Sequence, residues 1–74
     1  MDPRIRSAVA NAVDLVNANA GRATVHLLFH GEPELDFVAN AARLEGDVFK
    51  FEAGIEAFSG SVDELAEIRT ELVN

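Results

Sequence analysis

Apolar side chains recur along the chain at two different periods, which predicts an alternation of helices and strands. Between residues 3 and 18 the period is helical, and Asn19 and Gly21 are expected to end this first helix. Asp2 is expected to cap it, and Pro3 occupies the first helical position, where its missing N–H costs nothing. The predicted buried stripe consists of Ile5, Val9, Ala12, Val13 and Val16.

Two segments follow the strand period of two. In Ala23–Phe29 the odd-numbered side chains are apolar and predict one buried face, whereas Thr24 and His26 lie on the other. Residues 48–52 combine aromatic and β-branched side chains in a shorter strand.

Two further helices are expected. Pro33 and Gly46 bracket an Ala-containing run over residues 35–44, which favours a helix there. Ser61 and Glu64 form a capping box, which predicts a last helix. Its apolar face would contain Val62, Leu65, Ile68 and Leu72.

The resulting order α-β-α-β-α predicts a small two-layer α/β domain, because a strand–helix–strand crossover makes the two strands parallel. In an alternative, residues 35–41 form a strand and residues 45–47 turn the chain into the strand at 48–52. That alternative is an α+β fold, with an antiparallel meander between two helices.

The chain has 74 residues, enough for one domain over 1–74 with a thin core, and it has no cysteine to reinforce that core. Because a short parallel strand pair needs its edges covered, we expect self-association as a homodimer, or a protein partner, to complete the sheet. Thirteen acidic residues against six basic ones give a net charge of −7, which disfavours nucleic-acid binding. No apolar run is long enough for a membrane span, and the start Met1-Asp2-Pro3-Arg4 does not resemble a secretion signal, so a cytoplasmic location is expected.

Four segments form one pattern: the helical residues 10–16, the strand 25–31 that ends in His30-Gly31, the strand 48–54, and the helix start at 62–65. Together they resemble the DsrE-like family of small α/β sulfur-handling proteins. The resemblance implies a sulfur-carrying cysteine at position 53, but this chain has Ala53 there. A methyl group cannot form a thiolate or a persulfide. The resemblance therefore implies a non-catalytic relative, without the first and last strands of the family.

In the parallel arrangement, the residues that come after the two strands would meet at one edge of the sheet, where α/β folds bind ligands. The candidate ligand-binding residues are His30, Gly31, Glu32, Glu52 and Gly54. No nucleophile elbow or glycine-rich phosphate loop accompanies them. We therefore predict a non-catalytic binding or oligomerisation module without a cofactor. The alternative is a small-ligand carrier or enzyme that uses the cleft around His30 and Glu52.

Two other features have competing interpretations. His26 and His30 lie about 13 Å apart along an extended strand, too far to share one zinc ion, and with Glu32 as the nearest carboxylate no metal site is predicted. Phe58 lies in a turn-rich stretch, where it is either part of the core or an exposed anchor for a partner.

Overall fold

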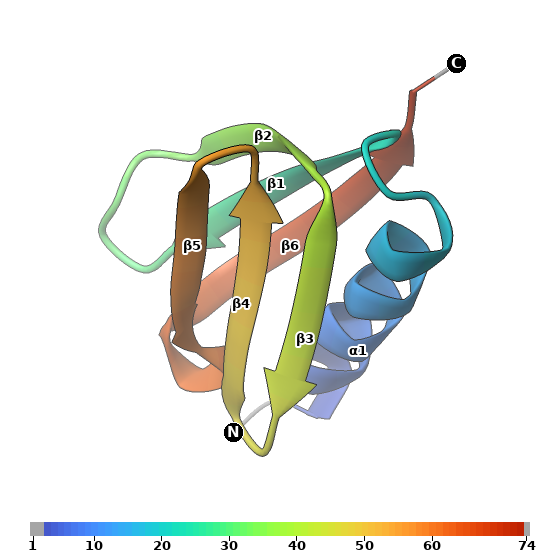
Figure 1. Ribbon diagram of the computed structural model, residues 1–74. Coiled ribbons are helices and arrows are strands. Elements are labelled where there is room, and N and C mark those ends of the chain that lie inside the picture. The colour runs from blue at the N-terminus through green and yellow to red at the C-terminus, as the bar shows by residue number, and fades with distance from the viewer. Residues whose placement is uncertain (1–2, 74) are drawn as a thin grey trace.

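The computed structural model describes residues 3–73, which contain one α-helix and six strands in two antiparallel sheets (Figure 1). The helix α1 spans Pro3–Ala18. The strands are β1 (Ala23–Phe29), β2 (Leu35–Ala39), β3 (Ala41–Glu45), β4 (Val48–Ala53), β5 (Glu56–Ser61) and β6 (Leu65–Leu72). One sheet has the order β2-β1-β6 and the other the order β3-β4-β5. The fold is therefore α+β and mostly sheet.

The predicted α/β fold with a parallel strand pair is wrong, because all four strand pairings are antiparallel. Residues 35–44, predicted as a helix, instead form β2 and β3 on either side of Asn40. Phe37 and Ala39 alternate with exposed neighbours and pair with β1, so burying them in a sheet outweighs the helix propensity of the alanines. The β3–β4 hairpin agrees with the alternative that placed a turn at residues 45–47.

The predicted last helix is also wrong, although its capping box forms. Glu64 Oε1 accepts a hydrogen bond from the Ser61 N–H at 2.9 Å, and Ser61 Oγ accepts one from the Asp63 N–H at 3.3 Å. The box opens only the single 3₁₀ turn η1 (Val62–Glu64), after which the chain continues as β6. A capping box fixes the first turn of a helix and does not determine the conformation of the residues after that turn.

A β-bulge explains the helix-like spacing of the apolar residues in β6. Phe29 pairs with Leu65 but Leu28 pairs with Glu67, which leaves one extra residue in β6. Leu65 and Ile68 are three residues apart and both are buried. The bulge therefore gives a strand the spacing that predicts a helix.

Several local predictions are confirmed. The first helix and the strands at 23–29 and 48–52 are present as α1, β1 and β4. The buried residues of α1 are Val9, Ala12, Val13 and Val16, while Ile5 is partly buried. Asp2, the expected cap, lies outside the described residues.

The helix lies at one side of the two sheets, next to β3 and β6 (Figure 1). Its apolar stripe joins an aromatic core in which Phe29 stacks on Phe49 with ring centroids 6.1 Å apart. Phe37 of β2 stacks on Phe58 of β5 at 4.2 Å, which ties the two sheets together.

Two polar residues of α1, Asn17 and Arg6, attach the helix to the sheet of β3. The Asn17 side chain donates to the carbonyl of Ala42 at 2.9 Å and accepts from the N–H of the same residue at 3.0 Å. At the other end of β3, Arg6 donates to the Gly46 carbonyl at 2.7 Å and lies 3.5 Å from Asp47. The helix thus covers the edge of β3.

Candidate functional site

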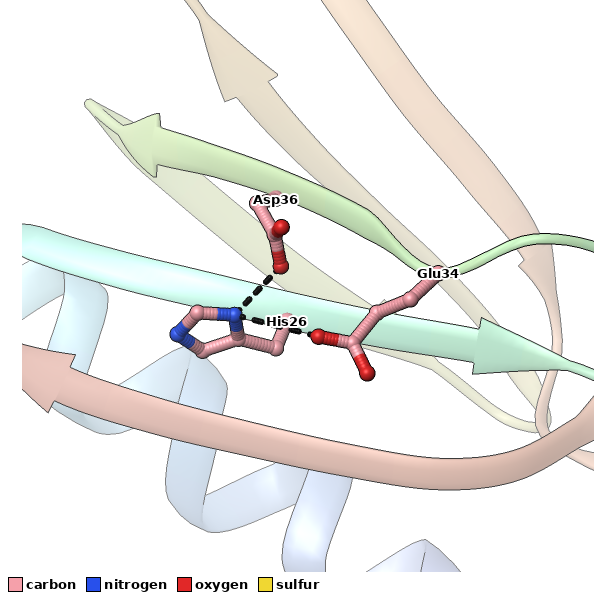
Figure 2. Close-up of side chains that lie close together, drawn as sticks. All are labelled: His26, Glu34 and Asp36. Atoms are coloured by element: carbon pink, nitrogen blue, oxygen red, sulfur yellow. Dashed lines mark hydrogen bonds and ion pairs between the residues drawn. The ribbon is translucent and has the colours of Figure 1, made fainter.

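Three side chains from two neighbouring strands form the His26 cluster, which we define as His26, Glu34 and Asp36 (Figure 2). His26 lies in β1 and is directly opposite Asp36 of β2, while Glu34 precedes β2. Because paired residues in adjacent strands lie on the same face, all three side chains gather on the outer face of the sheet.

The two carboxylates approach the same ring nitrogen of His26 (Figure 2). Nδ1 is hydrogen-bonded to Asp36 Oδ1 and lies 3.5 Å from Glu34 Oε1. One ligand atom from each residue lies within 4.8 Å of the other two. The His26 side chain is only 17% exposed, so the imidazole is held in place between the flanking strands.

Charges from β6 complete the surroundings of the cluster. Arg69, opposite His26 on the other side, places Nη2 3.3 Å from Glu34 Oε1. Glu71 Oε1 lies 3.7 Å from His26 Nε2, which is buried and has no hydrogen-bond partner.

The hydrogen bond with His26 lowers the pKa of Asp36, more than its partial desolvation raises it. The neighbouring Glu34 side chain and the electrostatic interactions with His26 and Arg69 act in the same direction. Asp36 is therefore an ionised acceptor at neutral pH. An imidazole nitrogen beside two carboxylate oxygens is a donor set typical of zinc and related divalent ions.

The sequence reasoning missed this cluster. It compared His26 with His30 and found them too far apart, and it placed Asp36 on a helix. The alternative prediction of a strand over residues 35–41 could have revealed the cluster. Antiparallel pairing of that strand with the strand 23–29, across a short loop, brings Asp36 opposite His26.

Of the predicted ligand-binding residues, His30 and Glu32 line an open hollow of about 540 Å³. Ser59 lines the same hollow, and so do Phe29, Pro33, Leu35, Asp63 and Glu64. In the described part of the chain, the His30 side chain forms no hydrogen bond or ion pair. The lining of the hollow is therefore partly acidic and partly apolar, with one histidine and one serine.

The other predicted residues lie elsewhere. Glu52 is in β4, where it lines a smaller hollow with Arg43 and Lys50, and its carboxylate is 3.7 Å from Lys50 Nζ. Gly54 belongs to the β4–β5 turn with a φ of +65°. The expected meeting of His30 with Glu52 depended on parallel strands, and the antiparallel fold does not bring them to the same hollow.

Phe58, the predicted partner-binding residue, is partly buried and packs on Phe37. The exposed large apolar side chains are different ones: Leu35, Val38, Val48, Ile55, Leu72 and Val73. Leu72 ends β6, and Ile55 lies at the tip of the β4–β5 hairpin.

Within residues 3–73, no helix combines the length and apolarity that a membrane span requires. No family model, curated protein or solved structure matches the chain. These comparisons leave the resemblance to the DsrE-like family as a prediction from sequence.

Proposed function

We propose that the protein is a non-catalytic oligomerisation module of the cytoplasm, in which β5 of one copy pairs with β6 of the next copy. The observation that carries this proposal is that β5 and β6 are edge strands of their sheets. An edge strand presents unpaired N–H and C=O groups, which a second strand can satisfy. Self-association therefore rests on these two edges, and not on the incomplete parallel sheet expected from the sequence.

The outer edge of β5 is suited to receive a strand. The two-residue turn Gly54-Ile55 makes Ala53 and Glu56 a hydrogen-bonded pair, and such pairs alternate along an antiparallel ladder. The N–H and C=O groups of Ala57 and Ser59 therefore point away from β4. Both side chains are small and uncharged, so they present no bulk or charge to an approaching strand.

The outer edge of β6 is defined in the same way. Val73 N–H donates to the Arg22 carbonyl at 2.6 Å, just beyond the strand pair Ala23–Leu72. Alternation along the ladder then directs the backbone groups of Thr70 and Leu72 away from β1. Leu72 is 51% exposed, and a neighbouring strand would cover part of it.

Pairing of unlike edges fits the position of the helix. Two β6 strands side by side would form one continuous sheet with two copies of α1 on the same face, because α1 packs on β6. In contrast, β5 lies on the side away from α1 (Figure 1). Pairing β5 with β6 therefore avoids a collision between helices and is of the head-to-tail kind, which can extend beyond a dimer.

Charge opposes this assembly, since each copy has a net charge of −7. Repulsion between exposed charges is screened over about 8–10 Å at physiological ionic strength. The assembly is therefore expected to require salt.

Sedimentation velocity over a range of protein concentrations in 0.5 M NaCl, about three times physiological ionic strength, tests the proposal. The wild-type chain is expected to form species larger than a dimer as concentration rises. Ser59→Pro removes an outward N–H without breaking a β4–β5 ladder bond and is expected to reduce this assembly strongly. Ser59→Ala keeps the N–H and is the matched control, expected to assemble as the wild type does. A wild-type monomer at every concentration, or equal assembly of both variants, contradicts the proposal.

A further inference from the structure

We propose that the His26 cluster is a binding site for a divalent transition-metal ion such as Zn²⁺, with His26 Nδ1, Asp36 and Glu34 as its protein ligands. The proposal is independent of the oligomerisation described above, because its three protein ligands come from β1, from β2 and from the residue before β2, whereas that assembly uses the backbone edges of β5 and β6.

The donor spacing is close to what such an ion needs. Zinc bonds of about 2.0–2.2 Å place neighbouring ligand atoms about 3.3 Å apart in a tetrahedron. Glu34 Oε1 lies 3.5 Å from His26 Nδ1, and the three ligand atoms lie within 4.8 Å of one another. Asp36 must move outward from its hydrogen bond with Nδ1, and its side chain, which is 57% exposed, is free to do so.

The second ring nitrogen of His26 gives an independent reason for a cation at the first. A carboxylate only accepts hydrogen bonds, so the contact with Asp36 places the ring proton on Nδ1 in a neutral imidazole. Nε2 is then a buried acceptor without a hydrogen-bond partner, and it lies 3.7 Å from Glu71 Oε1. A metal on Nδ1 moves the ring proton to Nε2, beside the Glu71 carboxylate. This histidine–carboxylate pair is the arrangement that commonly orients histidine ligands of metals.

The neighbouring charges also fit. Glu34, Asp36 and Glu71 together offset a dication, and Arg69 contacts Glu34 through Nη2 at 3.3 Å. Arg69 contacts the same oxygen of Glu34 that lies nearest to His26 Nδ1, so the guanidinium helps to hold that oxygen beside the ring nitrogen. Because one donor is an imidazole, the site should prefer Zn²⁺, Co²⁺ or Ni²⁺ over Mg²⁺ and Ca²⁺, which favour all-oxygen sites.

The first test is calorimetric titration of the full chain with Zn²⁺ in the presence of excess Mg²⁺. Saturable binding of one ion per chain is expected, weakened at least about tenfold in His26→Gln and in Asp36→Asn. His30→Gln is the matched histidine control and Glu67→Gln the carboxylate control on the same face; both are expected to bind as the wild type does. Absence of saturable binding, or binding that survives His26→Gln, overturns the proposal.

The second test uses only the wild-type chain and so does not depend on a variant folding. Long-range ¹H–¹⁵N correlation spectra report the state of each imidazole nitrogen. Zn²⁺ is expected to change the Nδ1 resonance of His26 to that of a metal-bound nitrogen and to leave Nε2 protonated, with His30 unaffected. An imidazole of His26 that is doubly protonated with and without Zn²⁺, or a change confined to His30, refutes the site.

Discussion

Blocking one edge strand at a time distinguishes head-to-tail assembly from pairing of like edges. Ser59→Pro removes an outward N–H from β5, and Thr70→Pro removes one from β6, while each variant retains its other edge. Each variant alone therefore lacks one half of the β5–β6 contact. Mixed together, the open β6 of the Ser59→Pro chain can pair with the open β5 of the Thr70→Pro chain.

The magnitude comes from the hydrogen bonds at the edge. Proline removes one donor and leaves a facing carbonyl without its partner, which costs about 1–3 kcal/mol. This cost corresponds to a weakening of about 5- to 150-fold in the dissociation constant of each contact, since 1.4 kcal/mol is tenfold. The pyrrolidine ring also occupies the position of the approaching strand, so the upper part of this range is expected.

Analytical ultracentrifugation with one variant fluorescently labelled measures the outcome. Each variant alone should sediment as a monomer, and the mixture should form a one-to-one heterodimer that does not grow further. Circular dichroism of each variant checks that the monomer remains folded. If the Thr70→Pro chain still dimerises alone, β5 pairs with β5; if mixing produces no heterodimer, the β5–β6 contact does not exist.

Four other predictions concern packing, the helix attachment, pH and salt. Gly60→Ala should lower stability by about 1–2 kcal/mol in urea unfolding, because the new methyl would lie 2.9 Å from a ring carbon of Phe29; an unchanged midpoint contradicts this. Asn17→Ala should lower the Tm by about 5–10 °C through loss of two hydrogen bonds between helix and sheet, while Asn17→Asp, which keeps the acceptor, should lose less. Because the pKa of Asp36 is lowered in the folded state, its ionised form contributes stability that is lost as pH falls through that pKa. His26→Ala should therefore raise the Asp36 pKa measured by carboxyl ¹³C titration. An unchanged pKa would contradict His26 as the main cause of the lowering. Raising NaCl should strengthen self-association because it screens the net charge, and weaker association at high salt would indicate attractive ion pairs instead.

An element could be predicted correctly from the sequence where the period of its apolar residues fitted only one type of secondary structure. The stripe of α1 and the alternation in β1 and β4 were sufficient to locate these elements, because local pattern and tertiary burial agree there. Residues 35–44 satisfied both a helical and a strand interpretation, and alanine propensity favoured the wrong one. Their strand conformation depends on pairing with β1 and β4, which are distant interactions that a local pattern does not contain.

The grouping of the candidate ligand-binding residues could be predicted only in part, for the same reason. His30 and Glu32 do share a hollow, since they are neighbours along the chain, but Glu52 was added through an assumed parallel arrangement. The His26 cluster needs the antiparallel register between β1 and β2. The strand β6 was predicted as a helix because its bulge gives the buried residues a helix-like spacing. Sites built by strand pairing become visible once the register is known.

Intermolecular contacts between backbone protons test the β5–β6 pairing most directly. In a mixture of isotope-labelled and unlabelled chains, an isotope-filtered NOE spectrum detects only contacts between copies. Contacts from Ala57 and Ser59 of one copy to Thr70 and Leu72 of another are expected. Contacts between identical strands, or no contacts between copies under conditions of high salt, would contradict head-to-tail assembly through these edges.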